Sequence, residues 1–309
     1  MSTGLSHSVP VSSDTPGGVW GTFRSYVALT KPRVIELLLV TTAPVMVLAA
    51  GGLPPLSLMA WTLLGGALSA GSANAFNSFI DRDIDRVMGR TSGRPLATGA
   101  VSERNALIFA WTLGIASVAL LWWTTNALAA LLSLAAILFY VFVYTLWLKR
   151  RSEQNIIWGG IAGCFPVLIG WAAVTGSLAL EPILLFLVVF LWTPPHYWPL
   201  SMRYREDYHQ VGVPMLAVVR PPAVVGVQII LYAWATVVAS LLLIPVAPMG
   251  VVYAVVAVVS GGWFVVESHL LYRRIIQGVE PRPMRVFHSS ISYLTLLFLA
   301  VGIDPLLPW

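Results

Sequence analysis

The sequence predicts an all-α protein, a polytopic membrane bundle of nine transmembrane helices. Hydrophobic residues make up 58% of the 309-residue chain, charged residues make up 10%, and the mean hydropathy is +0.81. Polar side chains this scarce cannot cover a soluble globule of that length. Because a helix satisfies its own backbone hydrogen bonds within the lipid bilayer, apolar segments of about 20 residues are expected to be helical.

Nine apolar segments close to this length follow one another along the chain. They are residues 34–50, 56–77, 106–123, 127–148, 156–175, 182–200, 223–246, 251–271 and 286–302. Residues 1–22 are rich in Ser, Gly, Thr and Pro and are expected to form a disordered cytoplasmic tail, with residues 23–309 as one domain. The only cysteine, Cys164, excludes an intramolecular disulfide and any cysteine-cluster metal site.

The basic residues define a topology. All 18 Lys and Arg residues lie before the first span or in the loops after spans two, four, six and eight. The positive-inside rule therefore places the N-terminus in the cytoplasm and the C-terminus on the opposite side, and we expect a bacterial cytoplasmic (inner) membrane. This topology explains the basic pI of about 9.6, so nucleic-acid binding is not needed.

A polar string ends the second span. At 100° per residue, Asn77, Asp81 and Asp85 fall at 0°, 40° and 80° on a helix, whereas Asp83 points away at 240°. The small residues of segment 65–73 lead into this string and allow neighbouring helices to approach closely. The acidic face is therefore expected to begin inside the bundle.

These residues suit a metal-bound diphosphate. Mg²⁺ binds through one or two carboxylates together with substrate phosphates, and Asp81 and Asp85 supply such a pair. Arg90 and Arg94 add forked donors for the outer phosphate oxygens. Such a set would stabilise a leaving diphosphate while the hydrocarbon tail of a prenyl diphosphate lies among apolar helices. The alternative is that the three aspartates pair locally with Arg82, Arg86 and Arg90 on an exposed helix end.

A second polar region ends the sixth span. Pro194 and Pro195 remove helical hydrogen bonds there, and such positions persist where the backbone faces protein or a cavity. His196 follows them and either serves a functional site or hydrogen-bonds a carbonyl near the helix end. Segment 149–151, with three basic residues after span four, is interpreted as a topological anchor. Glu267 is expected to pair with Arg273 or Arg274.

Two motifs resemble a known family. Asn77-x-x-x-Asp81-x-x-x-Asp85, with Arg90 and Arg94 behind it, resembles the first motif of the UbiA-type intramembrane prenyltransferases. A resemblance to the heme O synthase branch of that family is found in segments 192–198, 203–208 and 212–216, and in Lys31-Pro32-Arg33 before the first span.

This resemblance implies a central cavity opening to the cytoplasm and the transfer of a farnesyl group from farnesyl diphosphate to a vinyl group of heme B. Water addition would complete heme O, with Mg²⁺ required as cofactor. Asp207 would be a further metal ligand, although Glu206 and Asp207 are the only acids where many relatives carry a full second aspartate motif. His196 would contact heme iron, and Arg203 and Arg205 would bind the heme propionates. A heme-modifying enzyme or a terminal oxidase is the implied assembly partner.

Three other functions are open to the same sequence. A prenyltransferase for an aromatic quinone precursor would keep the fold and change the acceptor, but the Pro-Pro-His stretch argues against it. A CDP-alcohol phosphotransferase would need an aspartate motif that the chain lacks. A transport or heme-binding protein would be expected to place its polar groups near the bilayer midplane, whereas here they lie at the cytoplasmic rim.

Overall fold

The computed structural model describes residues 18–247 and 249–308, and these residues form helices and connecting loops without a strand. Among the described residues, nine helices or helix runs are long and apolar enough to cross a membrane, at the positions predicted from hydropathy. They are α2 (Pro32–Ala50), α3 (Leu56–Ile80), α5 (Glu103–Thr124), α6 (Ala127–Leu138) with η1 (Phe139–Leu148), α7 (Asn155–Gly159) with η2 (Gly160–Cys164) and α8 (Phe165–Thr175), α9 (Leu180–Arg203), α12 (Pro222–Leu241) with α13 (Leu243–Val246), α14 (Val251–Ile276), and α15 (Pro283–Ile303) with η3 (Asp304–Leu306).

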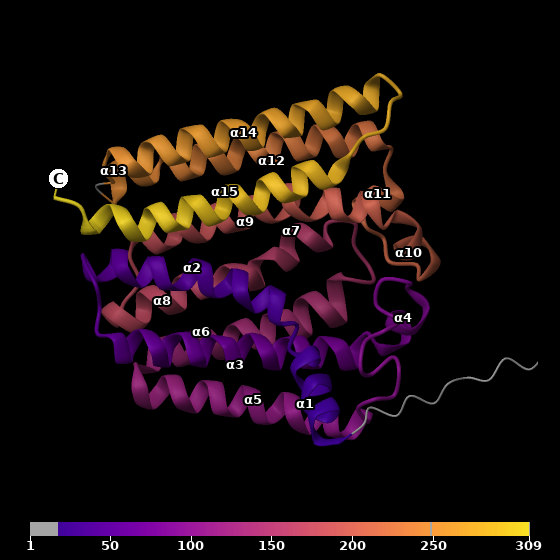
Figure 1. Ribbon diagram of the computed structural model, residues 1–309, viewed down its shortest axis with the longest axis horizontal. Helices are drawn as coiled ribbons and strands as arrows, with labels where there is room; N and C mark the ends of the chain where they lie inside the picture. The colour runs from indigo at the N-terminus through magenta and orange to yellow at the C-terminus, as the bar shows by residue number, and fades with distance from the viewer. Residues whose placement is uncertain (1–17, 248, 309) are drawn as a thin grey trace, which may run out of the picture.

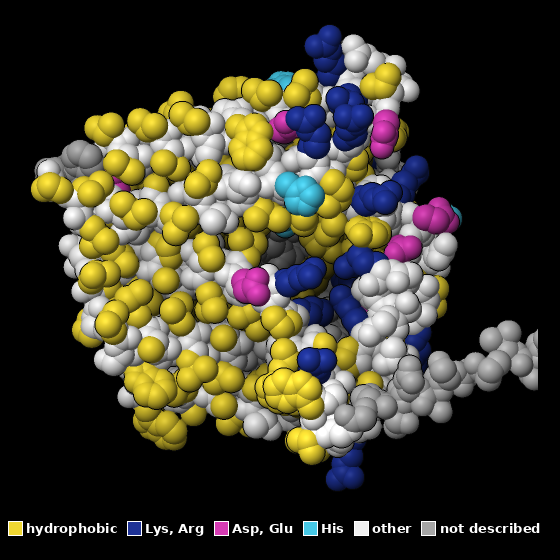
Figure 2. Space-filling view, viewed as in Figure 1, with side chains coloured by type: hydrophobic (Ala, Val, Ile, Leu, Met, Phe, Trp, Pro, Cys, Tyr) yellow, Lys and Arg dark blue, Asp and Glu magenta, His cyan; other side chains and the backbone are white. Residues whose placement is uncertain are grey.

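Four short helices lie outside the spans: α1 (Gly18–Leu29), α4 (Arg82–Val87), α10 (Arg205–Gln210) and α11 (Leu216–Val219). They gather at one end of the bundle, and the chain ends at the other (Figure 1). The Lys and Arg side chains in view cluster at that same end, while apolar side chains cover the rest of this face (Figure 2). This one-sided distribution agrees with the topology predicted from the basic loops, and the chain is a multi-pass membrane protein.

The helices close into a ring because the two ends of the chain meet. Helix α2 contacts α3, α8 and α15, while α9 contacts α8, α12 and α15. The small residues of α3 let α5 approach closely, as predicted. The Ser117 hydroxyl donates to the Gly65 carbonyl at 2.7 Å, and a Cβ on Gly65 would lie 2.6 Å from the Leu121 side chain. The polar face of α3 is thereby held within a tightly packed bundle.

The predicted tail lies mostly outside the described residues. Its last part, residues 18–22, belongs to α1 and therefore is helical. The packing of this helix against α3 explains the difference from the sequence-based boundary, since composition alone does not register a tertiary contact. Residues 1–17 are outside the described range.

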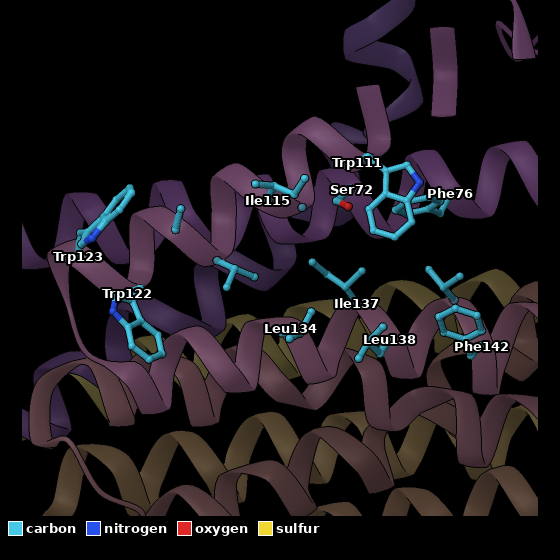
Figure 3. A pocket seen from close by; sticks show the side chains of 14 residues that line it. Ser72, Phe76, Trp111, Ile115, Trp122, Trp123, Leu134, Ile137, Leu138 and Phe142 are labelled. Atoms are coloured by element: carbon cyan, nitrogen blue, oxygen red, sulfur yellow. The ribbon is translucent and has the colours of Figure 1, made fainter. Parts of the chain in front are cut away.

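Two hollows are relevant to the site. The larger, about 460 Å³, is a groove between α5 and α6 with η1, and it is lined by Phe76, Trp111, Trp122 and Phe142 (Figure 3). Because Trp111 and Trp122 are more than half exposed, this groove opens on the outer, lipid-facing side. The smaller, about 120 Å³, lies inside the ring among α2, α3, α6 and α8 and reaches the polar end of α3.

Candidate active site

The acidic face forms at the junction of α3 and α4. Asn77 and Asp81 are 3% and 0% exposed and Asp85 is 3% exposed, whereas the Asp83 side chain is 59% exposed. The Asn77 side-chain Nδ2 donates to Asp81 Oδ2 at 2.7 Å, so the two residues act as a unit. The predicted separation of three inward residues from one outward aspartate is confirmed.

Each inward residue binds a basic side chain from a different part of the chain. Arg94 Nη1 donates to both carboxylate oxygens of Asp85, at 2.8 and 2.7 Å. Lys149 forms an ion pair with Asp81, and Lys31 Nζ donates to Asn77 Oδ1. Burial, with Arg94 and Lys149 nearby, holds the pKa of Lys31 well below its ordinary value. The site is therefore a compact set of alternating charges at one end of the bundle.

The alternative of local pairing on an exposed helix end is wrong. Arg82 pairs with Glu103 at 2.8 Å instead of with a neighbouring aspartate. Asp83 pairs with Arg150, which lowers the pKa of Asp83 to about 2 through hydrogen bonds from the guanidinium. The local spacing thus explains neither pair, because Glu103 lies on α5 and Arg150 lies in the turn after η1.

Lys149 and Arg150 are more than topological anchors. Lys149 follows η1, a π-helical stretch, and wider turns of this kind are frequent at functional sites. The same stretch contributes Thr145, whose hydroxyl accepts from Asn77 Nδ2 at 3.2 Å. Sequence analysis missed Lys149 and Lys31 because a basic residue next to a span has the same appearance whether it faces water or a site.

The acidic pair suits a divalent cation. Asp81 Oδ1 is buried and has no hydrogen-bond partner among the described residues, and Arg150 Nη2 lies 3.7 Å from it. An unpaired buried carboxylate oxygen is costly, and it is the ligand type that Mg²⁺ prefers. No three His, Cys, Asp or Glu side chains of the described chain lie together as a metal cluster. Asp207 is therefore not part of a single cluster with Asp81 and Asp85.

Asp207 joins the second polar region to the first. Its Oδ2 accepts from the Arg90 backbone N–H at 3.2 Å, so α10 contacts the loop that follows α4. The Arg90 guanidinium donates to Tyr208 Oη at 3.2 Å, and this phenol is 2.8 Å from Tyr197 Oη on α9. Burial raises the pKa of Tyr208 well above its ordinary value. The structure thus brings Arg90 and Asp207 together across 117 residues of sequence.

His196 is held rigidly on α9, which continues through Pro194 and Pro195 without ending. Its ring is stacked between Trp192 and Phe287, with centroid distances of 4.1 and 4.6 Å, and Nδ1 is 2.8 Å from Ser290 Oγ. The hydrogen bond to a carbonyl considered from the sequence is not the one formed. Nε2 has no hydrogen bond within the described residues.

The predictions for Arg203, Arg205 and Glu267 have different outcomes. Arg203 and Arg205 are exposed at the end of α9 and the start of α10, and Arg205 donates to the Val218 carbonyl at 3.4 Å. The expected partner of Glu267 is wrong, because Arg285 on α15 binds it at 2.7 Å. The pair joins α14 to the adjacent α15, so the sequence of α14 alone does not predict it.

The fold and site together define the class of protein. Residues 38–291 match the UbiA prenyltransferase family, so the chain belongs to that family. It is similar over 94% of its length to a protoheme IX farnesyltransferase from Clavibacter michiganensis subsp. michiganensis, at 68% identity over 95% of that protein. A protein of the same name from Leifsonia xyli subsp. xyli is 66% identical, with 94% of this chain and 95% of the relative covered.

Solved structures share the fold at low identity. A structure described as a digeranylgeranylglyceryl phosphate synthase has a TM-score of 0.75 and 17% identity, covering 92% of this chain and 98% of its own. A UbiA homologue from Archaeoglobus fulgidus, bound to GPP and Mg²⁺, has a TM-score of 0.68 and 19% identity, with 91% and 99% covered. These similarities confirm the predicted all-α membrane bundle.

Proposed function

We propose that this chain transfers the farnesyl group of farnesyl diphosphate to a vinyl group of heme B, with addition of water, to give heme O and diphosphate. The observation that carries this proposal is the buried Asp81 and Asp85 pair, with one unpaired oxygen, surrounded by basic side chains at the end of an apolar bundle. The names of relatives at 68% and 66% identity supply the acceptor.

The diphosphate binds at the charged end of the site. Asp81 and Asp85 would hold Mg²⁺, which neutralises the leaving diphosphate and lowers the barrier to breaking its C–O bond when it is bound. Arg90 and Arg94 bind the outer phosphate oxygens, and Asn77 positions Asp81 through its side-chain amide. Asp207 accepts a hydrogen bond from the Arg90 backbone N–H, so it positions the loop that carries Arg90 at the diphosphate end of the site.

The first part of the farnesyl tail lies in the inner cavity, whose volume of about 120 Å³ is smaller than the whole tail. This cavity is lined by apolar residues of four helices and touches Asn74 and Tyr140 at its polar end. The arrangement keeps the reacting carbon of farnesyl diphosphate at the charged rim and the hydrocarbon tail among apolar side chains. Exclusion of water there protects the allylic cation from premature capture. Tyr140 and Tyr144, with ring centroids 5.3 Å apart, offer aromatic faces to a cation at this point.

The reaction balances without a protein nucleophile. The farnesyl C1–O bond breaks and its electron pair leaves with the diphosphate. The terminal vinyl carbon of heme B then bonds to C1, which leaves a cation on the carbon beside the porphyrin ring. A water molecule adds to that carbon and loses a proton, and the product is the hydroxyethylfarnesyl group of heme O.

The heme binds on the side of His196. A metal-binding imidazole is usually oriented by a hydrogen bond on its other nitrogen, and Ser290 provides this bond to Nδ1. Stacking by Trp192 and Phe287 fixes the ring plane, so Nε2 is the atom that contacts iron. Arg203 and Arg205 bind the heme propionates from the exposed rim.

The charged end of the bundle faces the cytoplasm, with the C-terminus on the opposite side of a bacterial cytoplasmic membrane. Heme B is the substrate and heme O is the product, and a heme-modifying enzyme or a terminal oxidase is the assembly partner that heme O would serve.

One experiment tests the proposed function. The purified full chain is incubated with heme B, farnesyl diphosphate and Mg²⁺, and the heme is analysed by mass spectrometry. We expect a product carrying one farnesyl group and one water, and no product after chelation with EDTA. Unchanged heme after incubation with folded protein would contradict the proposal.

A further inference from the structure

Lys31 is a basic residue that a diphosphate site of two carboxylates and two arginines does not require. It lies between α1 and α2 with φ 54° and ψ 67°, in the left-handed region that residues other than glycine rarely adopt. Asn74 Nδ2 donates to the neighbouring Thr30 carbonyl at 2.9 Å and ties this junction to α3. The backbone is thereby fixed so that the partly buried Lys31 side chain points toward Asn77.

The contact of Lys31 is with one particular atom. Asn77 Nδ2 donates to Asp81 Oδ2 at 2.7 Å, and a carboxylate can only accept, so this assignment fixes the amide orientation. Asn77 Oδ1 must then face Lys31 Nζ, which lies 2.5 Å away. Since an amide binds a metal through its oxygen, a cation bound to Asn77 and the Lys31 ammonium exclude each other.

Lys31 is the most exchangeable of the three basic partners on the acidic face. Lys149 and Arg94 bind ionised carboxylates, which are strong acceptors, whereas Lys31 binds a neutral amide. A diphosphate anion offers Lys31 a better acceptor than Asn77 does, and its negative charge favours the ammonium form that burial opposes. Of these three bonds, the one from Lys31 to Asn77 is therefore the one that an incoming diphosphate most readily replaces.

We propose that Lys31 couples metal binding to diphosphate binding. Its ammonium holds Asn77 Oδ1 until a diphosphate takes it over, and this transfer frees the oxygen for the metal. Lys31 is thus a positioning residue that weakens the binding of a divalent cation until the diphosphate substrate is bound. This inference rests on the proposed function, because it requires a metal and a diphosphate to share the site.

The coupling has a reciprocal form. If diphosphate tightens metal binding by some factor, the metal tightens diphosphate binding by the same factor. Loss of the Lys31 charge removes both the competitor at Asn77 and the new bond to diphosphate. Metal alone should therefore bind more tightly, while the tightening caused by diphosphate should shrink.

The test measures Mn²⁺ binding to the full chain in detergent by electron paramagnetic resonance, with and without inorganic pyrophosphate. Free Mn²⁺ and its pyrophosphate complex are quantified in protein-free samples. For Lys31→Met we expect Mn²⁺ alone to bind roughly tenfold more tightly, within the usual size of coupling between sites, and pyrophosphate to cause little further gain. Lys31→Arg keeps a cation and should retain most of the coupling.

The matched control is Arg33→Met, because Arg33 is an exposed basic residue in the same segment. It should leave both Mn²⁺ affinities unchanged. Lys31→Gln serves as a second variant if Lys31→Met does not give folded protein. The inference is overturned if folded Lys31→Met or Lys31→Gln protein binds Mn²⁺ as the wild type does, or binds it more weakly in the absence of pyrophosphate.

The failure of this inference can be told apart from the failure of the proposed function. A wild-type protein that turns over heme B and shows coupled Mn²⁺ and pyrophosphate binding, with Lys31 variants that behave identically, overturns the inference alone. A wild-type protein that neither turns over nor binds Mn²⁺ with pyrophosphate overturns both.

Discussion

Replacement of Asp81 by Asn is the sharpest change that the site offers. The two side chains have nearly the same shape, so the substitution removes one negative charge without opening a cavity. Asp81 is 0% exposed and its Lys149 partner is 12% exposed. Removing one member of a buried ion pair costs about 3–5 kcal/mol, and we expect the low end of this range because asparagine still offers Lys149 an acceptor.

Asp81→Asn should lose more farnesyl-transfer activity than its loss of folding stability alone would cause. Removing one group that stabilises developing charge lowers kcat by roughly 100-fold to 1000-fold in other enzymes. Asp81→Asn would also lose the unpaired oxygen that suits a metal. We therefore expect farnesyl transfer, measured as heme product by mass spectrometry, to fall by at least about 100-fold at saturating farnesyl diphosphate.

Asp83→Asn is the matched control. It lies two residues away and removes the same charge, but its side chain is 59% exposed and pairs with Arg150 at the surface. A surface pair of this kind contributes about 0–1 kcal/mol, so turnover should change little. The reasoning is refuted if Asp81→Asn remains folded and active, or if Asp83→Asn loses activity to the same degree.

Three further predictions follow from the structure. Gly159→Ala would place a Cβ 2.2 Å from Tyr144 Cδ2, and we expect overpacking of about 1–3 kcal/mol, seen as a lower Tm and reduced turnover. His196→Ala should alter the absorption spectrum of bound heme while Mn²⁺ and pyrophosphate binding persist, and an unchanged spectrum would exclude it as the axial ligand. Asp207→Asn should weaken farnesyl diphosphate binding more than heme binding, as measured by equilibrium titration, and equal effects on both would contradict a diphosphate role.

The local features of this protein could be predicted from its sequence. The span positions follow from hydropathy, and the separation of Asp81 and Asp85 from Asp83 follows from the 100° turn of a helix. Both depend on residues within a single helix. The small residues before Asn77 likewise predicted the close approach of α5.

The contacts between distant segments could not be predicted in this way. Lys31 and Lys149 reach the acidic face from 46 and 68 residues away, and no local pattern distinguishes them from other basic residues beside a span. The partner of Glu267, Arg285, lies on α15, and no local pattern around Glu267 predicts this pair either. Charge alone fixes which side of the membrane these residues lie on, and only the packing of the ring decides which of them face inward.

The central claim is that this protein transfers a farnesyl group to heme B and not to an aromatic acceptor. It is tested most directly by a competition in which the purified chain receives heme B and an aromatic quinone precursor together, with farnesyl diphosphate and Mg²⁺. The account predicts that heme B gains the farnesyl group and water while the quinone precursor remains unmodified. A prenylated quinone precursor beside unchanged heme B would contradict it.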